Sequence, residues 1–297
     1  MPLPDRYLSL DNVRVRYWQA GQDGTPVLLV HGFGASVEWW ERNAAALATR
    51  HRVYALDLPG FGRSEQLPET PSLPMAAGFL QRFLDAVDAP RAHVVANSMG
   101  GLIALQLSVH YPGAVDRLVL VSPAGFARQI HWVFRLLPLP VLGRWLVRPG
   151  RRKLEALHRR FIHGDSSWLT ADWLDRIHAL ERLPGAAQML FDVARIGVNL
   201  GGIRADILEP LHQALSHLTA PTLIVWGDRD RLVPPGQAQI GQQLLPNAQI
   251  QIFPGCGHCP QLECAAEFNE LLLAFLNPRR PHANQEGRPG LSRPQSL

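Results

Sequence analysis

Lysine is almost absent from this chain of 297 residues. Lys153 is its only lysine, so arginine supplies nearly all of the positive charge behind the formal net charge of +4. No long block of like charges occurs, although such blocks are typical of basic segments that bind nucleic acids. We therefore expect no nucleic acid among the partners of this protein.

Cysteine is scarce as well. The three cysteines, Cys256, Cys259 and Cys264, lie within one short stretch. They are too few and too close together to form the disulfide framework of a secreted domain, since they could link only a few residues to one another. We expect a reducing cytoplasm as the location and a packing role for the cysteines. Two alternatives stay open: a thiol redox centre of Cys256 and Cys259, or a metal site that also includes His258.

Long hydrophobic runs are also missing. The most apolar stretch, residues 132–147, is interrupted by Arg135, Pro138, Pro140 and Arg144, which makes it a poor transmembrane span. The N-terminal residues lack the apolar core of a secretory signal. With 46% hydrophobic and 18% charged residues, the composition is that of an ordinary soluble globular protein. We expect no stable insertion into a membrane.

Short apolar runs bounded by turn residues are what the sequence does contain. They alternate with segments of helical length, which is typical of an α/β protein with a parallel sheet buried on both faces. The runs are 27–30, 53–56, 93–96, 118–121, 223–226 and 250–253. Between about 126 and 216 the alternation stops, and arginine-rich helical stretches with several tryptophans take its place.

This change of pattern predicts one sheet interrupted by a mostly helical cap. The tail that begins at Asn277 has too little apolar content to fold, so we expect it to be disordered. The predicted organisation is a core in two parts, 1–125 and 217–276, with the cap at 126–216 and the tail at 277–297.

Residues 13–18 alternate differently from the buried runs. Val13, Val15 and Tyr17 alternate with arginine and tryptophan. Strict alternation is typical of a strand with one exposed face. We expect an antiparallel edge strand here, with Arg16 and Trp18 on its exposed face.

The stretch HVVANSMGG, residues 93–101, carries the most specific local signal. A buried strand leads into a tight turn at Ser98 and then into a helix that begins near Met99, which is the setting of a nucleophile elbow. Gly100 provides the small residue that a close approach of strand and helix needs, and Ala96 takes the other small position. The alternative is that Ser98 merely caps the helix.

A glycine-rich loop, HGFGAS at residues 31–36, follows the run 27–30 directly. Its glycines would let backbone amides point toward a developing negative charge. We predict an oxyanion hole formed by the N–H groups of Phe33 and Met99. An ordinary strand-to-loop turn is the alternative.

A serine nucleophile needs a base and a carboxylate that orients the base. Asp228 and Asp230 follow the run 223–226, and His258 follows the next run, so all lie at strand ends where catalytic groups gather in open α/β sheets. Ser98, Asp230 and His258 would then act as nucleophile, orienting acid and general base. Asp57 also follows a strand, but the Pro-Gly turn after it indicates a structural role.

Together these motifs resemble the α/β-hydrolase superfamily across residues 8–276. The matching segments are HGFG, DLPGFGRS, NSMGG, GDRDRLVP and GCGH. In the family pattern G-x-x-D-x-x-x-P the acid corresponds to Asp230, which favours it over Asp228. The resemblance implies an α/β-hydrolase fold with an inserted cap and a serine hydrolase that needs neither cofactor nor metal.

The resemblance also limits the substrate. The elbow is similar to those of lipases and carboxylesterases, and to those of meta-cleavage-product hydrolases, which cut carbon–carbon bonds. HGFGAS lacks the H-G-S-G-P-G loop typical of the second group, and Cys259 replaces the tryptophan that commonly follows their histidine. We expect a small-molecule carboxylic ester or related acyl substrate. Carbon–carbon cleavage and acyl transfer remain as alternatives, as does a non-catalytic binding module.

The apolar residues of the cap are candidates for substrate specificity. Trp132 and Trp145 stand among leucines and arginines in the stretch 132–147. We expect this apolar stretch mainly to dock the cap onto the core, and Trp132 and Trp145 are also candidates to line a lipophilic acyl channel. A further alternative is a lid that touches a membrane surface.

Overall fold

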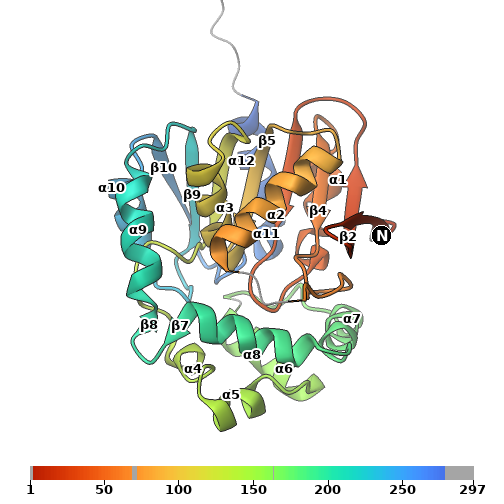
Figure 1. Cartoon of the computed structure of the whole chain (residues 1–297), viewed down its shortest axis with the longest axis vertical. Coiled ribbons are helices and arrows are strands. Elements are labelled where there is room, and N and C mark those ends of the chain that lie inside the picture. The colour runs from red at the N-terminus through yellow and green to blue at the C-terminus, as the bar shows by residue number, and fades with distance from the viewer. Residues whose placement is uncertain (1–2, 69–71, 163, 278–297) are drawn as a thin grey trace, which may run out of the picture.

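An eight-stranded sheet lies at the centre of the protein (Figure 1). The computed structural model describes residues 3–68, 72–162 and 164–277. The strand order is β1-β2-β4-β3-β5-β6-β9-β10; all neighbours are parallel except β1 with β2 and β2 with β4. The strands are β1 Arg6–Leu10, β2 Val13–Ala20, β3 Pro26–Val30, β4 Arg52–Leu56, β5 Ala92–Asn97, β6 Val115–Val121, β9 Thr222–Gly227 and β10 Ala248–Phe253.

Helices cover both faces of this sheet. Leu28 and Val30 of β3 pack into the cluster that includes α2 (Leu73–Ala86) and α3 (Met99–His110), whereas Leu29 faces α1 (Ala44–Leu47) and α12 (Ala265–Leu276). Successive residues of a strand point to opposite faces, so a strand buried on both sides must be apolar throughout. This explains why the central strands appear in the sequence as uninterrupted apolar runs.

The prediction of an edge strand at 13–18 was wrong in two respects. β1 forms the edge, and β2 lies between β1 and β4. Arg16 and Trp18 are each 1% exposed rather than on an open face. The reason is a group of carboxylates around the Arg16 guanidinium, since a charged side chain is tolerated in the interior when it is paired and hydrogen-bonded.

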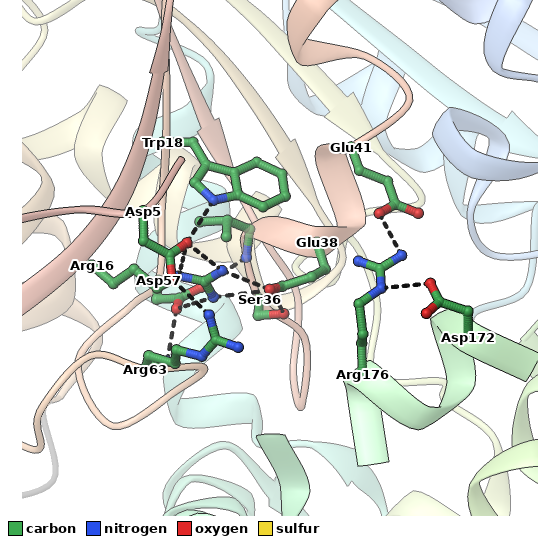
Figure 2. Close-up of polar contacts among 11 residues, drawn as sticks. Asp5, Arg16, Trp18, Ser36, Glu38, Glu41, Asp57, Arg63, Asp172 and Arg176 are labelled. Atoms are coloured by element: carbon green, nitrogen blue, oxygen red, sulfur yellow. Dashed lines mark hydrogen bonds and ion pairs between the residues drawn. The ribbon is translucent and has the colours of Figure 1, made fainter. Parts of the chain in front are cut away.

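Figure 2 shows this buried ion cluster, which joins Asp5, Arg16, Glu38 and Asp57. The Arg16 guanidinium lies 2.7 Å from Asp5, 2.6 Å from Glu38 and 3.1 Å from Asp57. Trp18 donates its indole N–H to Asp5 at 2.9 Å. The first hairpin is therefore tied to the loops that follow β3 and β4.

The chain between β6 and β9 leaves the sheet. Figure 1 shows α4 to α8 below the strand ends. Helix α9 also falls within the range 126–216 predicted for the cap, but it packs along α3 of the core. These elements are α4 Trp132–Arg135, α5 Pro140–Leu146, α6 Arg151–Leu157, the π-helical turn His158–Ile162, α7 Ala171–Glu181, α8 Ala186–Gly197, the short strands β7 Val198–Asn199 and β8 Gly202–Ile203, and α9 Ala205–Leu215. In the described ranges no helix is both long and apolar enough to cross a membrane.

Arg176 and Glu41 tie this helical segment to the core through an ion pair. Arg176 of α7 lies 2.9 Å from Glu41, which follows the 3-10 turn Val37–Trp40, and 3.1 Å from Asp172 in its own helix (Figure 2). The predicted tail lies outside the described residues, apart from Asn277.

Candidate active site

The register of the parallel strands brings the candidate residues to one edge of the sheet. Val30 at the end of β3 pairs with Leu56 of β4 and with Ala96 of β5. Farther along the sheet, Gly227 of β9 pairs with Phe253 of β10. Segments that follow these strands therefore begin side by side, although they are far apart in the sequence.

Ser98 occupies a strained turn between β5 and α3. Its φ is 55° and its ψ is −120°, and such a φ is rare for a residue other than glycine. A Cβ placed on Gly100 would lie 2.4 Å from the carbonyl oxygen of His31, so only glycine fits there. The Ser98 side chain makes no capping hydrogen bond to α3, which removes the helix-cap interpretation. Strain of this kind commonly marks a functional residue.

His258 and Asp230 form a buried pair. The His258 Nδ1 lies 2.7 Å from Asp230 Oδ2, and the two residues are 5% and 6% exposed. Because a carboxylate only accepts, Nδ1 carries the proton and donates it, which leaves Nε2 free to accept. Asp228 is directed elsewhere and accepts the N–H of Gly255 at 2.7 Å.

The Asp230 carboxylate is itself held by three further donors. Its Oδ2 accepts the Trp226 indole N–H at 3.0 Å, and its Oδ1 accepts the N–H groups of Leu232 and Val233 at 2.8 and 3.0 Å. Hydrogen bonds to an ionised acceptor are among the stronger ones in proteins. The carboxylate is thus fixed in the orientation that meets the His258 ring.

The loop at 31–36 lies directly against the Ser98 turn. A Cβ placed on Gly32 would lie 3.0 Å from the Ser98 Cβ. His31 donates from Nδ1 to the Gly32 carbonyl at 2.8 Å and accepts the Leu58 N–H on Nε2 at 3.0 Å. Complete burial lowers the pKa of His31 to about 4, so the ring stays neutral and keeps this arrangement. The residue that follows Gly32 is Phe33, one of the two predicted oxyanion donors.

Asp57 anchors the end of the same loop. Its carboxylate accepts the N–H of Val37 at 2.7 Å and that of Arg63 at 2.8 Å. Burial raises its pKa to about 6, in spite of the neighbouring Arg16 guanidinium. This geometry agrees with the structural role predicted for Asp57.

Two cavities meet at Ser98 and His258. Their volumes are about 110 Å³ and about 340 Å³. The smaller extends toward Met99, Leu102 and Val193, and the larger toward Leu154 and Leu190. Both linings are mainly apolar. The residues that line both are Phe33, Ser98, Phe134, Leu137, Leu232 and His258.

Trp132 and Trp145 do not reach these cavities. They are 62% and 60% exposed, and neither lines a cavity around Ser98 in the described part of the chain. Phe134 and Leu137 turn inward instead. Leu190 and Val193 of α8 also line the cavities but were not predicted, because their only signal in the sequence is the apolar side of an amphipathic helix.

The cysteine prediction needs a correction. Cys256 and Cys264 form a disulfide across the short helix α11 (Pro260–Glu263), so they are not simply packing residues. Cys259 is the free cysteine of the described residues, and burial raises the pKa of its thiol well above the usual range. A reactive thiol needs the opposite shift. The location in a reducing cytoplasm that we expected from the sequence stays a prediction.

The redox and metal alternatives lack geometric support at this loop. Cys256 pairs with Cys264 rather than with Cys259, so the C-x-x-C spacing forms no disulfide. Among the described residues, no group of three or more His, Cys, Asp or Glu side chains is placed to hold a metal ion.

Comparisons with known proteins agree with this arrangement. A family model described as the alpha/beta hydrolase fold matches residues 25–265. The chain is 33% identical over 271 residues to the dihydrolipoyllysine-residue acetyltransferase component of the acetoin cleaving system of Cupriavidus necator, a match that covers 91% of this chain and 68% of that protein. It is 32% identical over 277 residues to a 2-hydroxy-6-oxononadienedioate/2-hydroxy-6-oxononatrienedioate hydrolase of Burkholderia vietnamiensis, covering 89% and 91%.

Solved structures show the same fold. The crystal structure of a bacterial membrane phospholipase A superposes with a TM-score of 0.75 at 29% sequence identity. The match covers 92% of this chain and 86% of that one. The fold therefore extends over nearly the whole of the present chain.

Proposed function

Because the chain belongs to the α/β-hydrolase family and is a hydrolase, we propose that it cleaves carboxylic esters through an acyl-enzyme on Ser98. The observation that carries this proposal is that Ser98 and His258 both line two mainly apolar cavities. An ester has two parts, an acyl group and an alcohol, and each cavity can take one of them. The phospholipase A that shares the fold has the name of an ester hydrolase.

In the proposed mechanism, Ser98 Oγ attacks the ester carbonyl carbon while its proton passes to His258 Nε2. Asp230 holds the His258 ring through the Nδ1–H bond and stabilises the imidazolium that forms. The N–H groups of Phe33 and Met99 stabilise the oxyanion, and donors of this kind are typically worth ~10²-fold to 10³-fold in rate each. The alcohol leaves with the proton from His258. Water then attacks the acyl-enzyme and releases the acid.

We assign a specificity role to the cap segment, residues 126–216. Its residues Phe134, Leu137 and Leu190 form walls of the cavities, and the core supplies Ser98 and His258. We place the acyl group in the larger cavity, because its volume of about 340 Å³ is about three times that of the smaller cavity, about 110 Å³. The substrate is then a small molecule with a lipophilic acyl chain.

A series of p-nitrophenyl esters of increasing acyl length tests this proposal. We expect kcat/KM to rise by up to about fourfold per methylene, the equivalent of ~0.8 kcal/mol of burial, until the larger cavity is full. Leu190→Trp, which narrows that cavity, should shorten the preferred chain. The matched change Val193→Trp lies on the same helix but lines the smaller cavity, and should leave the preferred acyl length unchanged. A profile that neither substitution alters would exclude the cavities as the binding site.

Carbon–carbon bond hydrolysis is the second candidate. The relative from Burkholderia vietnamiensis, which matches along 91% of its length, has the name of such an enzyme. Including a meta-cleavage product in the same screen distinguishes the two reactions. Acyl transfer, suggested by the name of the relative from Cupriavidus necator, would appear as a new ester when an alcohol acceptor is added.

A further inference from the structure

Helices α4 and α5 expose apolar side chains to solvent. Trp132 is 62% exposed, Val141 85%, Leu142 37% and Trp145 60%. We call these four residues the cap face. Figure 1 shows α4 and α5 at the lower end of the molecule, on the far side of the cap segment from the strands. Single exposed apolar residues are normal, but several large ones on two neighbouring short helices indicate an interaction surface.

The same two helices are apolar on their inner side as well. Phe134, Leu137 and Leu146 line the larger cavity. A helix on the surface of a soluble protein usually buries one apolar side and presents a polar one to water. Docking onto the core is therefore achieved by the inner side alone, and it does not account for the tryptophans outside.

The chain segment that carries the cap face is rich in positive charge. Residues 126–164 contain a single acidic residue, Glu155, which forms ion pairs with Arg151 and Arg159. Arg144, Arg148 and Arg152 are exposed. The basic residues of this range are Arg128, Arg135, Arg144, Arg148, Arg151, Arg152, Lys153, Arg159 and Arg160.

We propose that the cap face binds reversibly to an anionic lipid surface. Tryptophan is the side chain that favours the boundary between headgroups and acyl chains, and arginine is attracted to anionic headgroups. The binding is peripheral, because Trp132, Val141 and Trp145 lie on helices far too short to span a bilayer. It would bring the cavity-lining helices α4 and α5 against the membrane.

Flotation of the full-length protein with vesicles tests the proposal. We expect binding to vesicles of phosphatidylglycerol and phosphatidylcholine, weaker binding to phosphatidylcholine alone, and loss of binding as salt is raised. Trp132→Ala with Trp145→Ala should weaken binding at least about tenfold, since two interfacial anchors are removed. Met75→Ala is the matched control, because Met75 is a large apolar residue that is 49% exposed on α2. Circular dichroism checks that each variant is folded.

Two results would overturn the proposal. One is a failure of binding to respond as expected: wild-type protein does not bind the anionic vesicles, or the double variant binds them as tightly as wild type. The other is a wild-type dimer in solution that the two tryptophan substitutions dissociate, which would mean that a second copy of the chain covers the cap face. No step of this test depends on catalysis, so its outcome is independent of the proposed ester hydrolysis.

A different observation concerns Glu263, whose carboxylate accepts hydrogen bonds from backbone N–H groups in two parts of the chain. Its Oε2 accepts the N–H of Gly257 at 2.8 Å and its Oε1 accepts that of Cys259 at 3.1 Å, so it holds the residues on both sides of His258. Its Oε2 also accepts the N–H groups of Gly164 and Asp165 in the cap segment, at 2.8 and 3.1 Å.

The backbone of His258 is held from two further directions. Its N–H donates to the carbonyl of Ile162 in the cap segment at 2.7 Å. Its own carbonyl accepts from the Asn97 side chain at 3.3 Å, just before Ser98. Charge-assisted hydrogen bonds such as those to Glu263 are short and directional. Glu263 therefore connects the histidine loop with the cap segment, in addition to the bond between His258 and Ile162.

The geometry points to Glu263 as a positioning residue that sets the place of His258 relative to Ser98. This second inference rests on the proposed function. Glu263→Gln keeps the size of the side chain but turns an amide group toward backbone N–H groups. A displacement of about 1 Å can cost ~10²-fold in rate, so we expect kcat to fall by about that factor while KM changes little. Labelling of Ser98 by a fluorophosphonate should slow in parallel.

Controls separate positioning from folding. Glu267→Gln is the matched change on the exposed side of α12 and should leave kcat unaltered. Glu263→Asp keeps the charge and should recover part of the loss, and thermal unfolding shows whether each variant is folded at the assay temperature. Full kcat in folded Glu263→Gln, beside an active wild type, would refute the positioning role. A wild type without esterase activity would instead refute the proposed function.

Discussion

Ser98→Ala is expected to abolish ester hydrolysis, with a fall in kcat of ~10⁶-fold. The hydroxyl is the attacking group, and its removal changes little volume, so the protein should stay folded. His258→Ala should have nearly the same effect, because without the base the serine is not activated. The double variant should be no slower than either single one, since the residues act as a unit. Steady-state kinetics on the preferred p-nitrophenyl ester measures all three.

Ser108→Ala is the control for this prediction. Ser108 is a buried serine on the same helix, α3, where its hydroxyl donates to the Ala104 carbonyl at 2.8 Å. Its loss should leave kcat within a small factor of wild type. Substantial activity in Ser98→Ala would exclude the acyl-enzyme. A double variant far slower than both single ones would mean that the two residues serve separate steps.

Asp230→Asn is expected to lower kcat by ~10⁴-fold. The amide nitrogen cannot accept the His258 Nδ1–H, so the ring would favour the tautomer that presents a proton rather than a lone pair to Ser98. Oδ1 can still accept from Leu232 and Val233, whereas the new amide nitrogen would face the Trp226 indole N–H, so thermal unfolding checks that the variant is folded. Asp228→Asn is the matched control in the same turn. It should cost little, because Asp228 accepts from Gly255 and not from His258. The opposite ranking of the two variants would assign the orienting role to Asp228.

Much of the fold could be predicted because strands buried on both faces of a sheet appear in the sequence as continuous apolar runs. The runs at 27–30, 93–96 and 223–226 all became central strands, and the predicted α/β-hydrolase fold and hydrolase class are confirmed. The pairing of His258 with Asp230 rather than Asp228 could be anticipated only through the family pattern. Asp228 and Asp230 are the same residue type in the same turn, so residue type cannot distinguish them. The hydrogen bonds that orient Asp230 toward His258 come from Trp226, Leu232 and Val233.

The misses share a physical cause, which is that their partners lie far away in the sequence. Arg16 was expected on an exposed face because residues 13–18 alternate, but Glu38 and Asp57, from the segments that follow β3 and β4, form ion pairs with its guanidinium. Trp132 was expected inside because tryptophan is apolar. Helix α4 has only four residues, so its sequence shows no periodic pattern that would indicate which side faces the core. The neighbouring helices determine that side.

The buried ion cluster links the N-terminal hairpin to the proposed active site. Arg16 neutralises Glu38 and Asp57, and Asp57 in turn holds the loop on which the Phe33 amide lies. Removing one partner from such a cluster leaves uncompensated charge in the interior, at a cost of about 3–5 kcal/mol. Removing the chain up to and including Arg16, or displacing the hairpin with a bulky fusion, should therefore weaken the proposed oxyanion hole. The effect would act through the charges of the cluster, because the hairpin does not line the cavities at Ser98.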